Sequence, residues 1–261
     1  MNFDSRSVIK SSVGFRRFFA LCTVCFLVAG NILAAKLDPQ SEAILKKARQ
    51  FISDESTLNG VNSLRFEGTI KDPEGKTGKI VISLQKPYKM VQSIHHENGV
   101  VDEFGLNDYE GWLKRFKTED PDVYALMPVD VTRLKRLRAN TYEGLNFFST
   151  KTSYGRKIEY QGKQDLDGKT VEVVKVLYGS AVFIRYFETT TGELLLSEIE
   201  NGERIQEQGE MVVDGIRFPK YLVTFNGDDQ ISHLEFHSIQ VNPKFEDSLF
   251  TQPPLPSLRK K

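Results

Sequence analysis

Two imidazoles and a carboxylate alternate near the end of the chain, at His233, Glu235 and His237. Because successive side chains of a strand point to opposite faces, these three would share one face, and zinc accepts such donors. Leu234 and Phe236, which lie between them, would then point into a core. The pattern is typical of an antiparallel strand that has one solvent-exposed face and one buried face. We therefore predict no metal site and no cofactor here.

Catalytic motifs are missing from the sequence. It contains no nucleophile elbow, zinc-protease helix, phosphate loop or dinucleotide-binding turn. The carboxylate pairs Asp120/Asp122 and Asp228/Asp229 fall in predicted turns, where aspartate bonds its own backbone. Lys+Arg and Asp+Glu both number 35, so the chain lacks the basic surplus that nucleic-acid binding requires. We predict neither an enzyme nor a nucleic-acid-binding protein, and an unrecognised hydrolase is left as an alternative.

The first 35 residues form a separate unit of sequence. A basic segment up to Arg17 is followed by an apolar run, Phe18 to Gly30, and then by Ala34 and Ala35. This order is typical of a secretory signal peptide, and the run is shorter than the roughly 20 residues of a membrane span. We predict cleavage near Ala34 or Ala35 and export to the periplasm. Both cysteines lie in the apolar run, so the mature chain would contain no thiol.

Hydrophobic spacing predicts one helix followed by many strands. Asp38 and Pro39 favour a helix start, and apolar residues recur at three- and four-residue spacing through about Asp54. From Leu64 onward, apolar and polar residues alternate between Asn/Asp-Gly turns, which indicates antiparallel hairpins. Residues 125–148 interrupt this alternation, and within them Val131, Leu134, Leu137 and Leu145, which follow Met127-Pro128, have helical spacing. Later strands, each pairing with the next, are expected at 156–161, 170–178, 181–188, 193–200, 204–212, 217–226 and 230–241.

Two features of these elements have alternative interpretations. The basic run Arg133, Lys135, Arg136 and Arg138 is interpreted as the solvated face of the inserted helix. The alternative is a transient contact with anionic lipid headgroups or an acidic partner. Trp112, the only tryptophan, favours packing at the core or rim over a ligand platform.

The elements predict a single domain, mainly β with some helix. Two helical segments cannot cover about ten strands in the manner of a sandwich, so one strongly curved antiparallel sheet would wrap around itself. The resulting hollow would suit an elongated apolar ligand. The alternative is a hollow that side chains fill.

Five stretches of the sequence carry a family resemblance. The chain resembles the outer-membrane lipoprotein-sorting superfamily, the periplasmic carriers and receptors with the Lol-type fold. Tyr109 departs from the pattern, since it replaces the first glycine of the family's turn. The stretches are Ala43–Ala48 with Leu64–Gly68, then Lys86-Pro87-Tyr88-Lys89-Met90, Asn107–Trp112, Val213-Asp214-Gly215-Ile216-Arg217-Phe218-Pro219, and Val241-Asn242-Pro243 with Asp247, Leu249, Phe250 and Pro253.

This resemblance implies an unclosed β-barrel with helices as a lid over an apolar cavity. It implies non-catalytic transfer of lipid or lipoprotein acyl chains, and envelope proteins as further partners. We divide the chain into a signal peptide (1–35), one Lol-type half-barrel domain (36–250) and a disordered tail (251–261), and expect a monomer. The alternative function is an envelope interaction or scaffold protein that has the same fold and no ligand cavity.

Alternation also selects the side chains that would line such a cavity. One face of a continuous sheet points inward, and the inserted segment would close over it. The predicted lining residues are Phe66, Ile80, Ile82, Leu84, Met90, Met127, Leu134, Leu137, Phe183, Leu234 and Phe236. Simple core packing is the alternative at each of these positions.

Overall fold

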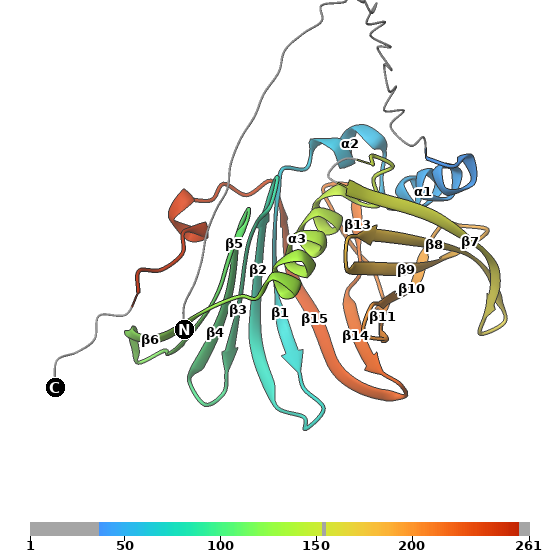
Figure 1. Cartoon of the computed structure of the whole chain (residues 1–261). Helices are drawn as coiled ribbons and strands as arrows, with labels where there is room; N and C mark the ends of the chain where they lie inside the picture. Colours follow the sequence, from blue (N-terminus) through green and yellow to red (C-terminus); the bar gives the residue numbers. More distant parts are fainter. Residues whose placement is uncertain (1–36, 153–154, 256–261) are drawn as a thin grey trace, which may run out of the picture. The chain divides into compact units, whose positions relative to one another are not determined.

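The computed structural model describes residues 37–152 and 155–255 (Figure 1). The predicted signal peptide and the tail beyond residue 255 lie outside the described residues. None of the helices in the described ranges is long and apolar enough to span a membrane.

Two helices precede the sheet, where the sequence predicted one. Helix α1 spans Pro39–Ile52, and the Asp38 carboxylate accepts hydrogen bonds from the backbone of Gln40 and Ser41 at 3.0 Å. A short helix α2, Glu55–Gly60, follows. Asp54 begins it by accepting from the Thr57 amide at 2.9 Å, so this residue caps a second helix instead of ending the first.

Thirteen strands form one antiparallel sheet, in the order β6-β5-β4-β3-β2-β1-β15-β14-β11-β10-β9-β8-β7. The strands nearest the two ends of the described chain, β1 and β15, lie next to each other in the sheet, and β6 and β7 are its free edges. The bounds are β1 Ser63–Lys71, β2 Thr77–Gln85, β3 Lys89–His96, β4 Val100–Asn107, β5 Glu110–Lys117, β6 Asp120–Pro128, β7 Arg156–Leu166, β8 Lys169–Tyr178, β9 Ala181–Glu188, β10 Leu194–Ile199, β11 Glu203–Gln208, β14 Tyr221–Asn226 and β15 Asp229–Val241.

The late part of the chain is not a simple meander. After Gln208 the chain leaves the sheet at Gly209, whose φ of 65° is a left-handed conformation that glycine adopts without strain. The strands β12 (Met211–Val213) and β13 (Ile216–Phe218) then pair only with each other. The predicted strands 204–212 and 217–226 are therefore each divided, and β11 pairs with β14 across this excursion.

The sheet is interrupted later in the chain than predicted. Strand β6 continues to Pro128, so Asp120 and Asp122 belong to a strand and not to a turn. Helix α3, Val131–Asn146, begins where the Asp130 carboxylate accepts from the amides of Thr132 and Arg133 at 2.9 Å. The predicted interruption of the sheet at 125 was wrong, because residues up to Pro128 pair with β5 as a strand, whereas the helical spacing from Val131 onward is confirmed.

Helix α3 lies within the curve of the sheet and contacts β2, β4 and β9 (Figure 1). A first core cluster includes Leu64, Leu106 and Leu145, and a second, on α1, α3, β8 and β9, includes Leu45 and Val174. The last element, the 3-10 helix η2 (Asp247–Phe250), contacts β3 and β4. The predicted architecture is confirmed: an unclosed, curved antiparallel sheet with an N-terminal helix, α1, and an inserted helix, α3.

Candidate ligand cavity

A cavity of about 630 Å³ lies between the sheet and helices α1 and α3. Seven of the eleven residues predicted from alternation line it, and they come from five strands and α3. They are Phe66, Ile82, Leu84, Met90, Leu137, Phe183 and Phe236. That these side chains bind a ligand stays a prediction.

Four predicted lining residues lie elsewhere. Ile80 and Leu234 are buried in the first core cluster, and Leu134 is half-buried against that cluster. Met127 lies on the edge strand β6 opposite Leu113 and is 45% exposed. Its assignment to the lid was wrong, because residue 127 belongs to the strand before Pro128 and not to the helix after it.

Aromatic rings surround one end of the cavity, which we call the apolar end. The ring of Phe66 packs against Phe236 at 5.1 Å and edge-on against Phe218 at 5.8 Å, centroid to centroid. Phe147 contacts Phe218 at 6.1 Å and is the C-cap of α3, with a φ of 46°. Sequence reasoning missed Phe147 and Phe218, since neither belongs to an alternating run of the main sheet.

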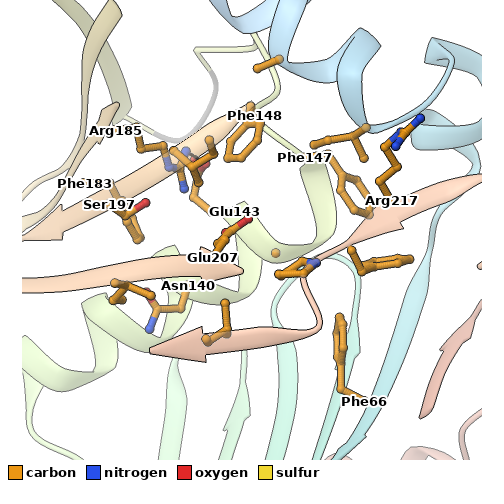
Figure 2. Close-up of a pocket in the computed structure, with 18 of the residues that line it drawn as sticks. Phe66, Asn140, Glu143, Phe147, Phe148, Phe183, Arg185, Ser197, Glu207 and Arg217 are labelled. Carbon is orange, nitrogen blue, oxygen red and sulfur yellow. Dashed lines mark hydrogen bonds and ion pairs between the residues drawn. The ribbon is translucent and has the colours of Figure 1, made fainter. Parts of the chain in front are cut away.

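The opposite end, which we call the polar end, is built by α3 and strands β9, β10 and β11. It carries polar side chains that sequence analysis did not select, and Figure 2 shows them on the side of the cavity away from Phe66. They are Asn140, Glu143, Arg185, Ser197 and Glu207. The cavity therefore has two ends of different chemistry.

A buried ion cluster anchors α3 at the polar end. The Glu143 carboxylate accepts hydrogen bonds from Arg185 Nη1, from Arg156 Nε at 2.9 Å and from the Tyr178 hydroxyl. Burial alone would raise the pKa of Glu143, but the two guanidinium groups outweigh it and hold that pKa below its usual value. The cluster ties α3 to β7, β8 and β9, and nothing in the sequence pattern pointed to it.

Glu207 on β11 is the second carboxylate at the polar end, and it is not paired. Among the described residues it interacts electrostatically with Arg185 and Glu193 but makes no hydrogen bond or ion pair. Burial, with a small contribution from Glu193, raises the pKa of Glu207 to about 7, although Arg185 opposes the shift. The side chain retains some accessible surface even though protein surrounds it, because it faces the cavity.

The basic run on α3 is only partly solvated. Arg138 stacks on Tyr88 at 4.0 Å and on Tyr109 at 3.8 Å, and pairs with Asp108. Arg136 donates through Nη2 to the Val182 carbonyl at 2.9 Å and through Nε to the Glu200 carboxylate at 3.0 Å. The expected solvated face was wrong for these two residues, because they tie α3 to both halves of the sheet. Lys135 and Arg133 are exposed.

The remaining candidates for chemistry have structural partners. His237 Nε2 lies 2.9 Å from the Thr69 hydroxyl, and the Glu235 carboxylate lies 3.5 Å from Lys220 Nζ. The described ranges hold no group of three metal-binding side chains. Trp112 is 1% exposed and packs on Gly105, where a Cβ would overlap the indole, so the core interpretation is confirmed.

Similarity to known proteins is found in the structure and not in the sequence. No protein-family model and no curated protein matches the sequence. The structure resembles a LolA superfamily protein from Nitrosomonas europaea, with TM-score 0.54, 11% identity, and coverage of 81% of this chain and 97% of the other. A domain assigned to outer membrane lipoprotein sorting, from Vibrio parahaemolyticus, gives TM-score 0.54 at 11% identity over 80% and 97% of the two chains.

A third similar structure is a DUF1329 family protein from Desulfovibrio piger, with TM-score 0.51, 9% identity, and coverage of 81% of this chain and 97% of the other. In each of the three comparisons the matched region spans 97% of the other chain. They confirm the Lol-type fold that the sequence resemblance implied, and at these identities they establish the fold alone.

Proposed function

We propose that this protein is a periplasmic carrier that binds acyl chains of a lipid or lipoprotein and transfers them without catalysis. The observation that carries the proposal is the cavity of about 630 Å³ between the curved sheet and α3. Its volume lies in the range of small-molecule sites, and most of its lining is apolar. The Lol-type fold of the similar structures supports this function.

The apolar end offers enough surface for a useful affinity. Burial of a long chain contributes about 0.8 kcal/mol per methylene, so twelve methylenes would contribute on the order of 10 kcal/mol before ordering costs. A carrier requires reversible binding of this kind. We propose that residues 1–35 are a signal peptide removed near Ala34 or Ala35. N-terminal sequencing of the protein recovered from a periplasmic fraction tests that step.

Uptake of an apolar probe tests the carrier function. Delipidated protein should bind N-phenyl-1-naphthylamine, and dodecyl amphiphiles should displace the dye. Ile82→Trp, which fills the cavity from β2, should lower dye uptake at least severalfold. Val81→Trp is the matched control, because Val81 is the adjacent residue, points to the opposite face of β2 and does not line the cavity. Equal uptake by both variants, each with a native thermal transition, would contradict the proposal.

A scaffold function is the second candidate, and one surface favours it. Large apolar side chains are exposed in the β4–β5 turn (Tyr109), on the edge strand β6 (Val123 and Met127) and at the start of α3 (Val131). Exposed apolar surface is typical of protein contact sites. Recovery of a protein partner from delipidated envelope extract, lost on Val123→Lys and unaffected by Ile82→Trp, would favour this function over the carrier.

A further inference from the structure

The polar end of the cavity presents side chains whose hydrogen-bonding capacity is unused. Within the described ranges, the side chains of Glu207, Ser197 and Asn140 line the cavity and make no side-chain hydrogen bond. Asn140 is exposed, whereas Ser197 is buried and Glu207 is partly buried. Buried polar groups in proteins nearly always have hydrogen-bond partners, and a buried group without one destabilises the fold. An unmet carboxylate that faces a cavity is therefore a site for a donor that comes from elsewhere.

Arginine at this end does not supply that donor. Arg185 Nη1 donates to Glu143, and the planar guanidinium lies against the rings of Phe148 and Phe183 at 4.8 Å. Arg185 Nε has almost no accessible surface and makes no hydrogen bond among the described residues. The guanidinium is thus committed to the buried cluster.

The charges around the polar end disfavour an anionic head. Glu207 and Glu193 both line the cavity and repel each other, which contributes to the raised pKa of Glu207. A carboxylate or phosphate placed beside them would add a third negative charge. A cationic head would face Arg185, whose positive charge already interacts with Glu207. An uncharged head with O–H or N–H donors avoids both penalties.

The two ends belong to one continuous cavity. Figure 2 shows Glu207 and Ser197 toward one side of the cavity and Phe66 toward the other. A single amphipathic molecule can therefore place its chain among the aromatic rings and its head at β10 and β11.

We propose that the polar end receives an uncharged ligand head with hydroxyl or amide donors, that Glu207 is its acceptor, and that the attached acyl chain occupies the apolar end. This assignment rests on the carrier function proposed above and adds the class of head to it. Ser197 and Asn140 would supply one further hydroxyl and one amide to the same head. The ligand class is thus a neutral acylated polyol or an N-acylated amine, in contrast to a free fatty acid or a lipid phosphate.

Three probes with the same C12 chain test the head. Monolauroylglycerol, laurate and dodecylamine are titrated against the naphthylamine dye at pH 8, on the native protein, on Glu207→Gln and on Glu159→Gln. Glu159 is exposed on β7 outside the cavity, so its variant loses the same charge without touching the site. The monolauroylglycerol hydroxyls would donate to the ionised Glu207 carboxylate, which laurate cannot do. We therefore expect monolauroylglycerol to displace the dye at about tenfold lower concentration than laurate.

The expected result is that Glu207→Gln reduces this preference to about threefold or less, mainly because laurate binds better once the negative charge is gone. Glu159→Gln should keep the native preference. Equal displacement by laurate and monolauroylglycerol on native protein, or stronger displacement by dodecylamine, would overturn the head assignment and leave the carrier function standing. A dye that binds but is displaced by none of the three probes would overturn both.

Discussion

The two ends of the cavity differ in how they are held together. The apolar end is made mainly of strand faces from β1, β2, β3 and β15, which neighbouring strands keep in register, and the rings of Phe147 and Phe218 complete it. The polar end depends on side-chain pairs between a helix and strands that share no backbone hydrogen bonds with it, above all Glu143 with Arg156 and Arg185. Within the polar end the Glu143 carboxylate is fully paired, whereas the Glu207 carboxylate is not. The contrast between the two ends concerns the stability of the fold. The contrast between the two carboxylates concerns ligand binding.

The largest expected effect is the loss of the paired carboxylate. Glu143→Gln would leave two buried guanidinium groups without a counter-charge, and breaking a buried ion pair in this way costs about 3–5 kcal/mol. Urea unfolding should report the loss as a lower midpoint with a similar m-value. Glu159→Gln serves as the surface control and should change stability by less than about 0.5 kcal/mol. A Glu143 variant as stable as the control would mean that the cluster does not hold α3.

The apolar end allows a comparison between two isoleucines on the same face of β2. Ile80 is 3% exposed in the packed core, and Ile82 lines the cavity. Truncation of a packed isoleucine to alanine costs about 2–5 kcal/mol because it opens a new void. Ile82→Ala enlarges a space that already exists, so it should cost about half as much as Ile80→Ala, and only Ile82→Ala should alter dye uptake. Equal losses of stability would indicate that side chains fill the hollow.

The unpaired carboxylate gives a pH dependence of stability with a definite sign. The pKa of Glu207 is about 7 in the folded protein and 4.5 for a free glutamate, so between these values the folded state binds the proton more tightly. The free energy of unfolding should therefore fall as the pH rises from about 4.5 to 7 and then remain low. The cost above pH 7 is on the order of 2 to 3 kcal/mol.

Glu207→Gln removes this cost where the glutamate is charged. Thermal melting should show the variant to be more stable than native protein at pH 8, by about 2 kcal/mol, and nearly equal to it at pH 5. The paired Glu143 behaves in the opposite sense, since its lowered pKa stabilises the fold at neutral pH. A Glu207 variant that is less stable than native protein at pH 8 would indicate a partner for this carboxylate within the protein.

Sequence pattern predicted the parts of the molecule that depend on local periodicity. The helix start at Asp38, most strands and seven lining residues follow from spacing and turn residues alone. The pairing of β1 with β15 does not, because nothing local in either strand specifies a neighbour 170 residues away along the chain. The family resemblance, and not the pattern, suggested that the sheet stays open.

The polar end was missed for a related reason. Glu207 lies in the run Glu203–Gln208, which is polar at almost every position and gives no sign of which residue faces inward. Glu143 is the one acidic residue of α3, which is otherwise basic, and its partners are on strands that only the tertiary fold brings close to it. Charged side chains are assigned to solvent by any rule based on hydrophobic spacing. Burial of these two carboxylates therefore depends on contacts that a single sequence does not display.

The smallest expected effect separates the cavity from the outer edge of the sheet. Met127→Gln changes a half-exposed residue of β6 that does not line the cavity, so stability should change by less than about 0.5 kcal/mol and dye uptake should be unchanged. Met90→Gln is the matched variant, since Met90 is 6% exposed, lines the cavity on β3 and would place an amide among apolar side chains. Dye titration of both variants decides the comparison.

Strand β3 is the last strand toward the β6 edge that contributes residues to the cavity lining. If Met127→Gln weakens dye uptake as much as Met90→Gln does, the edge strand β6 contributes to binding, and the site extends beyond β3. If only Met90→Gln weakens it, the exposed methionine at the edge belongs to a surface independent of the cavity.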